Sequence, residues 1–297
     1  MIALRRAGTA LILIVAIALF ADGHSARSEE HGPQAAKPTP AACRRSGFRV
    51  VVDVGHTVEV PGAISARGVP EYAFNLALAR DVKRALVDAG FETTVLSITS
   101  EAPPLGLFER AFRANKMAAD LFISIHHDSV PDPLLQTWYY DGQQNRFNDS
   151  FPGYAIFISS ENADRAGSLT FGRLLGEQLQ ARGIRYTSHY TLASMRTRRR
   201  QLVDADAGVY RYDQLVVLKE TRMPAVLLEA GSIVNRQEEL ALASPERRAL
   251  ESAAIAAAVE DFCAARASRR GERLARRRST PTAAGRPRRV NAARFAR

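Results

Sequence analysis

The sequence is poor in cysteine, with two thiols in 297 residues. Cys43 and Cys263 each lack a second ligand nearby in the chain, which argues against a zinc site built on clustered thiols. The chain also lacks an internal repeat, so it is not a repeat protein. A helix-borne His-Glu-x-x-His motif is absent as well. Any metal ligands must therefore come from separate parts of the chain.

Long apolar runs are scarce too. The one pronounced run, residues 7–21, is short for a membrane span, which needs about 20 residues. Arg5 and Arg6 precede it, and small residues follow it up to Ala26. This pattern predicts a secretory signal peptide over residues 1–26, with a single membrane anchor as the alternative. Export of this kind predicts a periplasmic protein.

Acidic residues are nearly missing from the other end of the chain. Residues 266–297 hold twelve arginines and one acid, Glu272, whereas the whole chain has a net charge of +10. The basic character therefore belongs to this segment, which we interpret as a disordered tail. In an exported protein we expect no nucleic-acid partner, and instead attraction to anionic envelope surfaces. A solvated tail without a partner is the alternative. Residues 27–46, polar and with three prolines, predict a disordered linker.

Strand-like and helix-like segments alternate between residues 47 and 265. Such alternation predicts one α/β domain with a mostly parallel central sheet and helices on both faces. Gly90 and Gly183 are expected to end two of the helices. The predicted strands are 48–54, 91–98, 121–126, 154–159, 215–219 and 225–229, and the predicted helices are 71–89, 107–119, 168–182 (capped by Ser168) and 245–265.

Three of these strands end on ionisable side chains. The runs are Val-Val-Val-Asp-Val-Gly-His (50–56), Leu-Phe-Ile-Ser-Ile-His-His-Asp-Ser (121–129) and Ala-Val-Leu-Leu-Glu-Ala-Gly (225–231). Sites in open α/β sheets form at the carboxyl ends of strands. His56 and His126, joined by Glu71 at the start of the first helix, supply two imidazoles and one carboxylate, which suit a catalytic Zn²⁺. Taken singly, each could instead be an ordinary strand-end or helix-capping residue, and Glu229 a sheet-edge carboxylate in a salt bridge.

Four segments, in order, carry a family resemblance. They are Val-Val-Asp-Val-Gly-His (51–56), Gly-Val-Pro-Glu-Tyr-Ala-Phe-Asn-Leu (68–76), Ala-Asp-Leu-Phe-Ile-Ser-Ile-His (119–126) and Met-Pro-Ala-Val-Leu-Leu-Glu-Ala-Gly (223–231), the last followed by Asn235 and Glu238-Glu239. Residues 48–262 thereby resemble the zinc-dependent N-acetylmuramoyl-L-alanine amidases of the amidase-3 family. These enzymes cleave peptidoglycan between the lactyl group of muramic acid and the first L-alanine.

The resemblance implies a phosphorylase/hydrolase-like fold and a role for each candidate residue. It implies His56, Glu71 and His126 as zinc ligands and Glu229 as the catalytic carboxylate, with peptidoglycan as the substrate. Two alternatives stay open: a zinc amidohydrolase or peptidase acting on a small acyl-amino acid or peptide, and a wall-binding protein without catalysis.

The chain departs from the family pattern in two places. Gly-His-Thr-Val stands where the family usually has Gly-His-Gly-Gly, which predicts a stiffer loop after His56 and a reshaped pocket rim. The third motif continues His126-His127-Asp128-Ser129 where the family usually has His-x-Asn-Ala. On a strand His127 points to the opposite face, so we expect His126 to be the ligand and keep His127 as an outer or substrate-contacting group. Asp128 either orients a ligand imidazole or caps the following turn.

Two long connections interrupt the alternation. Residues 130–153 include Trp138-Tyr139-Tyr140, which we expect to pack against sugar or peptide, with a local core as the alternative. Residues 186–212 include Arg196 and Arg198 to Arg200, which are candidates for stem-peptide carboxylates or anionic glycan, with a solvated basic loop as the alternative. In some relatives an inserted segment covers the zinc until a partner protein moves it. By analogy, either connection could do so here, and a protein activator is conceivable.

The two cysteines flank the predicted domain. Export makes a disulfide between Cys43 and Cys263 chemically possible. It would close a long loop and stabilise the fold by about 4 kcal/mol in the chain-entropy account. Two unpaired thiols are the alternative.

Overall fold

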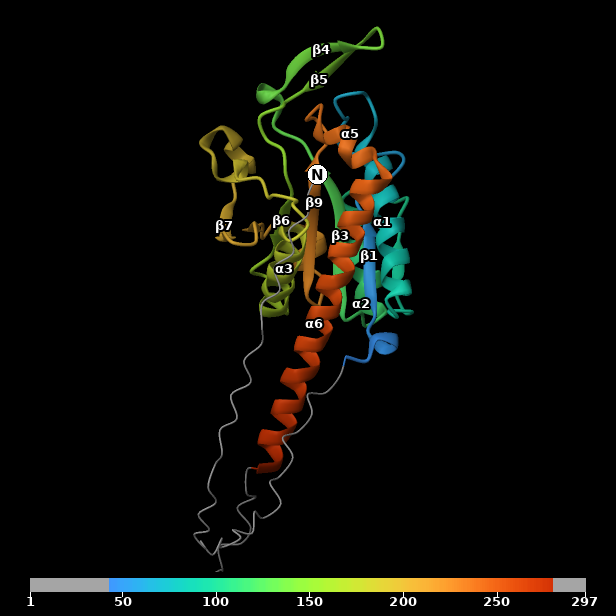
Figure 1. The fold of residues 1–297 in the computed structure, drawn as a ribbon, viewed down its shortest axis with the longest axis vertical. Helices are drawn as coiled ribbons and strands as arrows, with labels where there is room; N and C mark the ends of the chain where they lie inside the picture. The colour runs from blue at the N-terminus through green and yellow to red at the C-terminus, as the bar shows by residue number, and fades with distance from the viewer. Residues whose placement is uncertain (1–42, 280–297) are drawn as a thin grey trace, which may run out of the picture. The chain divides into compact units, whose positions relative to one another are not determined.

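A seven-stranded sheet forms the centre of the domain (Figure 1). The computed structural model describes residues 43–279, so the expected signal peptide, most of the linker and the end of the basic tail lie outside it. The strand order is β2-β1-β3-β9-β6-β8-β7. The strands are β1 (Val50–Val54), β2 (Val95–Ser97), β3 (Leu121–Asp128), β6 (Ala155–Ile158), β7 (Gln201–Asp204), β8 (Val209–Arg211) and β9 (Ala225–Ser232).

Most neighbouring strands are parallel, which confirms the predicted sheet type. β2, β1, β3 and β9 pair in parallel, as do β6 and β8. β6 is antiparallel to β9, and β7 is antiparallel to β8. The four valines of β1 are all buried, as expected for a strand of a parallel sheet covered on both faces, and its one polar residue, Asp53, is buried as well. Val50, Val52 and Val54 enter one core, and Val51 enters the core on the opposite face.

Helices cover both faces of the sheet, as predicted. On one face α6 (Pro245–Ser279) packs against α1 (Glu71–Asp88) and α3 (Arg165–Gln180), as Figure 1 shows. The other face holds α2 (Leu105–Lys116) and α4 (Val216–Lys219), which contact each other. The short helix α5 (Glu238–Ala243) follows β9 and packs against α6.

The two long connections contain structure that the sequence did not indicate. Residues 130–153 form the 3-10 turn η2 (Asp132–Leu134) and a separate hairpin of β4 (Gln136–Tyr140) and β5 (Gln143–Phe147), which extends beyond the sheet (Figure 1). Asp141 and Gly142 have φ values of 50° and 72°, which an Asp-Gly pair adopts in a two-residue hairpin turn. The second connection forms η3 (His189–Thr191), η4 (Ala193–Arg198) and β7.

Several predicted elements were wrong in detail. The strand expected at 91–98 is limited to Val95–Ser97. Residues 43–46, expected in a disordered linker, belong to the domain, with a disulfide at Cys43 and a 3-10 turn at Arg45–Gly47. The segment expected as a strand at 215–219 is the helix α4, because a short apolar run does not distinguish a buried strand from a buried helix. Helix α3 begins at Arg165, and its cap is Asp164, whose carboxylate accepts a hydrogen bond from the Gly167 N–H, so Ser168 is not the cap. Helix α6 continues to Ser279, so the first part of the segment expected as a disordered tail is helical.

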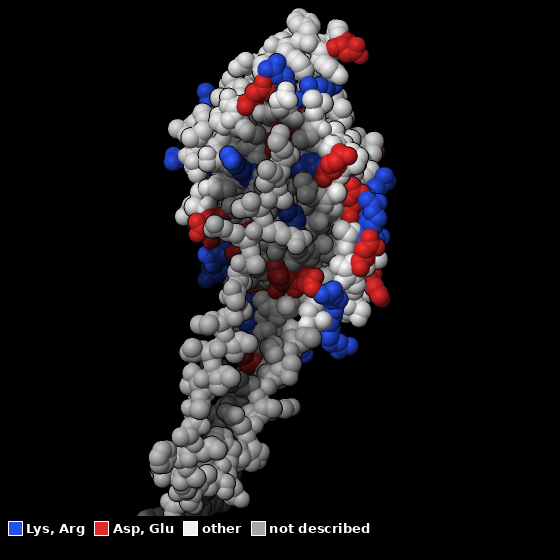
Figure 2. Space-filling model, in the orientation of Figure 1, with Lys and Arg blue, Asp and Glu red and all other residues white. Residues whose placement is uncertain are grey.

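A disulfide joins Cys43 to Cys263 and so fastens the start of the domain to α6. Arg45, in the 3-10 turn η1 (Arg45–Gly47), forms an ion pair with Glu260 beside it. On the face shown in Figure 2, basic and acidic side chains are interspersed, as expected for a nearly neutral domain. Among residues 43–279, no helix combines the length and the apolar character that a membrane crossing needs.

Candidate metal centre

The predicted site residues meet at one edge of the sheet. Strand β1 leads into His56, β3 carries His126, and β9 carries Glu229, while α1 begins at Glu71. His126 and Glu229 are direct partners in the parallel register of β3 and β9. Parallel neighbours end at the same edge, so the topology brings together residues from distant parts of the sequence.

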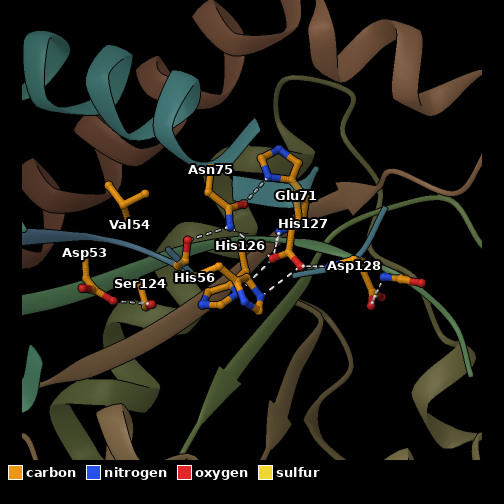
Figure 3. A network of polar contacts seen from close by, with 12 residues as sticks. Asp53, Val54, His56, Glu71, Asn75, Ser124, His126, His127 and Asp128 are labelled. Atoms are coloured by element: carbon orange, nitrogen blue, oxygen red, sulfur yellow. Dashed lines mark hydrogen bonds and ion pairs between the residues drawn. The ribbon is translucent and has the colours of Figure 1, made fainter. Parts of the chain in front are cut away.

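His56, Glu71 and His126 form a compact group (Figure 3). His56 Nε2 lies 3.0 Å from Glu71 Oε2, and His126 Nδ1 lies 3.0 Å from Glu71 Oε1. One ligand atom from each residue lies within 4.8 Å of the other two, which is close enough for all three to bind one metal ion. Burial acts to raise the pKa of Glu71, but hydrogen bonds with His126 and His56 hold it well below its ordinary value. Glu71 is therefore available as an anionic ligand.

Two glycines make room for this group. A Cβ atom on Gly55 would clash with the ring of His126, and one on Gly62 would clash with the carboxylate of Glu71. Neither position can carry a side chain without moving the group. His56 itself has a φ of 66°, an uncommon conformation for a residue other than glycine. Strained backbone of this kind clusters at functional sites.

Buried polar side chains hold the group in place. Asn75 Nδ2 donates to Gly55 O at 3.2 Å and to Glu71 Oε1 at 3.1 Å. Arg110, buried and paired with Asp53 at 2.8 Å, donates to the backbone oxygens of Val54 and His56 and so fixes the turn that carries the first imidazole. Sequence reasoning missed Arg110, because an arginine on a short amphipathic helix carries no sign of burial. Asn75 stood in a matched motif, but its role became visible only from its contacts.

His127 lies outside the group, as the strand alternation predicted. Its ring packs against Phe74. Its Nδ1 lies 2.8 Å from Asn75 Oδ1 (Figure 3). Burial lowers the pKa of His127 to about 3, so the ring is neutral. His127 thus contacts Asn75, which in turn holds Glu71. This is the role outside the ligand group that the sequence left open for it.

Glu229 faces the same cavity as the three candidate ligands. This cavity has a volume of about 610 Å³, and its rim includes Arg146 from β5 and Arg198 from the second connection. The Oε2 atom of Glu229 is buried and has no hydrogen-bond partner among the described residues. Burial raises the pKa of Glu229 well above its ordinary value, and the charges of Asp128 and Glu71 act in the same direction. A carboxyl in this setting is suited to receive a proton.

The two departures from the family pattern have structural consequences. Thr57 is buried, and its Oγ1 accepts a hydrogen bond from Val60 N at 2.9 Å, which closes the turn after His56. Asp128 Oδ1 accepts hydrogen bonds from Ser129 N at 2.7 Å and from the Tyr190 hydroxyl at 2.7 Å. Asp128 therefore caps the turn after β3 and binds the second connection.

The donor set suits a zinc ion. Two imidazole nitrogens and one carboxylate oxygen are the ligand types of catalytic zinc sites, which keep a further position for water or substrate. The group borders an open cavity, and His56 is only half-buried, so a fourth position is accessible. Asn75 donates a hydrogen bond to the carboxylate of Glu71, and hydrogen bonds of this kind orient metal ligands.

Known proteins resemble this chain in sequence. N-acetylmuramoyl-L-alanine amidase AmiC of Neisseria meningitidis is 28% identical over 257 residues, which are 82% of this chain and 60% of that protein. AmiA of Escherichia coli, a protein of the same description, is 29% identical over 233 residues, which are 75% of this chain and 79% of that protein.

Solved structures share the fold. The N-acetylmuramyl-L-alanine amidase Ami1 from Mycobacterium smegmatis superposes with a TM-score of 0.58 at 21% identity, over 76% of this chain and all of that one. The catalytic domain of CwlV from Paenibacillus polymyxa gives 0.52 at 24% identity, over 72% of this chain and 97% of that one. Residues 50–261, most of the sequence, match the family described as N-acetylmuramoyl-L-alanine amidase. The chain therefore belongs to the N-acetylmuramoyl-L-alanine amidase family.

Proposed function

We propose that this protein hydrolyses, with zinc, the amide bond between the lactyl group of N-acetylmuramic acid and L-alanine in peptidoglycan. One observation carries the proposal. His56, Glu71 and His126 offer three ligand atoms within 4.8 Å of one another, and Glu229 borders the same cavity. Family membership supports the choice of bond and of substrate.

His56, Glu71 and His126 are the residues that would hold the metal. A zinc ion bound by such ligands supplies Lewis acidity, which lowers the pKa of a water molecule and polarises the scissile carbonyl. The protein contributes the placement of these ligands. Arg110 fixes the turn of His56, and Asn75 fixes the carboxylate of Glu71.

Glu229 is the proposed general acid and base. Its Oε2 takes a proton from the attacking water and later gives that proton to the leaving amine of L-alanine. The proton stays on one oxygen between the two steps, and the buried setting that raises the pKa of Glu229 favours that state. The register of β3 and β9 keeps Glu229 beside His126, so the carboxylate and the ligands have a fixed relation.

We infer a periplasmic location for this activity. The disulfide between Cys43 and Cys263 supports it, because structural disulfides form in oxidising compartments. Osmotic-shock fractionation of cells producing the full chain tests the location. Retention of the protein in the cytoplasmic fraction would contradict it.

Digestion of isolated cell-wall sacculi, followed by mass spectrometry of the products, tests the function. We expect stem peptides with a free L-alanine amine and glycan strands with free lactyl groups. A chelator should abolish their release, and added zinc should restore it. Glu229→Gln should lower the rate about 10³-fold, within the range of a lost general acid-base. Glu177→Gln, the same change at an exposed position of α3, is the matched control and should leave the rate unchanged.

Three results would contradict the proposal. Full activity after both chelation and the Glu229→Gln substitution would remove zinc and Glu229 from the mechanism. Cleavage of small acylated peptides without release of products from sacculi would favour a different amidohydrolase. Zinc-free protein that sediments with sacculi without cleaving them would favour a wall-binding protein.

A further inference from the structure

Arg198 borders the catalytic cavity without being fully engaged by the protein. Its side chain is 39% exposed, and it lines the cavity together with Glu229 and the three candidate ligands. Its described ion-pair partner is Asp128, at 3.4 Å from Nη2 to Oδ1. That oxygen already accepts shorter hydrogen bonds from Ser129 N and from the Tyr190 hydroxyl. A guanidinium has five N–H donors, so most of those on Arg198 remain available to a ligand.

The backbone that carries Arg198 is firmly held. Met195 is fully buried in the core that contains Val51, and Arg200 N donates to Tyr190 O at 2.8 Å. The guanidinium of Arg200 also lies 3.5 Å from the centre of the Tyr212 ring. Between these anchors Arg196 has φ 50° and ψ −118°, an unusual backbone conformation for this residue. Arg198 is therefore presented at the cavity by a segment whose position is fixed before a ligand binds, which lowers the entropy lost on binding.

The remaining charges of the cavity make Arg198 the suited partner for an anion. The lining residues include the acids Glu71, Asp128, Asp132 and Glu229. Arg146 is the other arginine in the described lining, and Asp132 engages it at both ends: Nη2 donates to the backbone oxygen at 2.6 Å and Nη1 lies 3.6 Å from Oδ1. An anionic substrate group would be repelled along most of this wall and attracted at Arg198. A carboxylate also matches the planar donor pair of a guanidinium.

We propose that Arg198 binds a free carboxylate on the residue that follows L-alanine in the stem peptide and thereby selects substrates that carry it. This inference rests on the proposed function, because it assigns a binding partner within the same site. In peptidoglycan the residue after L-alanine is a γ-linked glutamate, which carries either a free α-carboxylate or its amide. Arg198 distinguishes the two because a carboxamide, unlike a carboxylate, is neutral and has one acceptor oxygen in place of two.

Two muropeptides that differ only at this group test the proposal. For the zinc-loaded wild-type protein, kcat/KM should be about tenfold or more higher for the carboxylate form than for the carboxamide form. Arg198→Ala should remove this preference by lowering kcat/KM on the carboxylate form alone. Arg198→Lys, which keeps the charge but not the planar donor pair, should retain part of it. Arg211→Ala is the control, since Arg211 is exposed at the end of β8 and lines a different cavity.

The outcomes separate the two proposals. A wild-type protein that cleaves both muropeptides equally overturns the role of Arg198 and leaves the amidase function standing. An equal loss on both substrates in Arg198→Ala also overturns it, because that pattern indicates a structural partner of Asp128. If Arg198→Ala does not fold, the wild-type preference and the Arg198→Lys ratio still decide the question. If the wild-type protein cleaves neither muropeptide, the result contradicts the proposed function instead.

Discussion

The strand ends and the two long connections build different parts of the same cavity. The candidate ligands and Glu229 come from β1, β3, β9 and the start of α1, and their positions follow from parallel register and buried hydrogen bonds. The connections supply the rim, including Arg146 and Arg198, whose guanidinium groups reach solvent. The strand ends are therefore suited to the chemistry, and the connections to the choice of substrate.

The two regions also differ in how firmly their side chains are held. At the strand ends Glu71 contacts both imidazoles, Asn75 and backbone N–H groups, so little can move independently. In the hairpin Trp138 stacks on Tyr140 and donates to Ala66 O at 2.8 Å, whereas Tyr139 is 72% exposed. The aromatic segment is thus divided between a local core and a free face. Substitutions should accordingly change rate and metal binding in the first region, and substrate affinity in the second.

The largest expected effect is that of Glu71→Gln. The substitution removes an anionic ligand and replaces it with a neutral amide, so we expect zinc content to fall and activity to drop on the order of 10³-fold, because the metal supplies several kcal/mol. Elemental analysis after dialysis and the sacculus assay measure the two effects. Glu59→Gln, an exposed position in the loop after His56, should change neither. Unchanged zinc content in Glu71→Gln would show that Glu71 is not a metal ligand, and metal binding could then not be assigned to the strand ends.

The sequence also predicted that the residues at the strand ends would lie together. Hydrophobic runs that stop at His56, His126 and Glu229 indicate buried strands with polar tips, and a parallel sheet places such tips at one edge. Glu71 was a candidate because it opens a helix with a clear apolar pattern. The alternation of a strand favoured His126 over His127. Periodicity and topology named these candidates, but each alone could have been an ordinary polar residue, and the family resemblance supplied the ligand set and the role of Glu229.

The connections were not predictable in the same way. The hairpin was not predicted, because its strands alternate weakly and bury little and the Asp141-Gly142 turn was the only local signal for it. The burial of Arg110 and its bonds to the turn of His56 depend on how α2 meets β1, which no local pattern encodes. The helix α4 was mistaken for a strand for a similar reason, because Val217 and Leu218 are buried by contacts that are distant in sequence.

The disulfide provides a test of the strand-end region as a scaffold. Cys43 precedes β1 and Cys263 lies in α6, so the bond closes a long loop around the sheet. Cys263→Ser should lower the free energy of unfolding by about 4 kcal/mol, chiefly because the unfolded chain gains freedom. Urea unfolding followed by circular dichroism measures the change. Activity at low temperature should persist, and its loss there would mean that the bond shapes the site itself.

A buried carboxyl in α6 makes this scaffold sensitive to pH. Burial raises the pKa of Glu251 from 4.5 to about 7, although Arg247 donates to it at 2.7 Å. The folded protein therefore keeps a proton that the unfolded chain releases. This contribution to stability is complete below pH 4.5 and is lost as the pH rises through about 7. The loss amounts to about 3 kcal/mol.

Glu251→Gln isolates the contribution of this group. The amide resembles the protonated carboxyl, so between pH 4.5 and pH 8 the variant should gain about 3 kcal/mol relative to the wild-type protein. Denaturant unfolding at a series of pH values gives the difference curve. Parallel curves for the two proteins would show that Glu251 has no raised pKa in the folded state.

Tyr139 offers the smallest effect and the finest separation of the two regions. Its ring is largely exposed on a hairpin whose β5 residues line the cavity, so Tyr139→Ala should change the free energy of unfolding by less than about 0.5 kcal/mol. If the free face of the hairpin packs against glycan, KM should rise about fivefold, the equivalent of one aromatic contact, with kcat unchanged.

Tyr72→Phe on α1 keeps the ring of a tyrosine that packs against the core and should leave KM unchanged. Steady-state kinetics on solubilised glycan strands decides between these outcomes. An unchanged KM in Tyr139→Ala would confine substrate selection to the Arg198 side of the rim, whereas a fall in kcat would show that the hairpin acts on the chemistry and that the two regions are not separable.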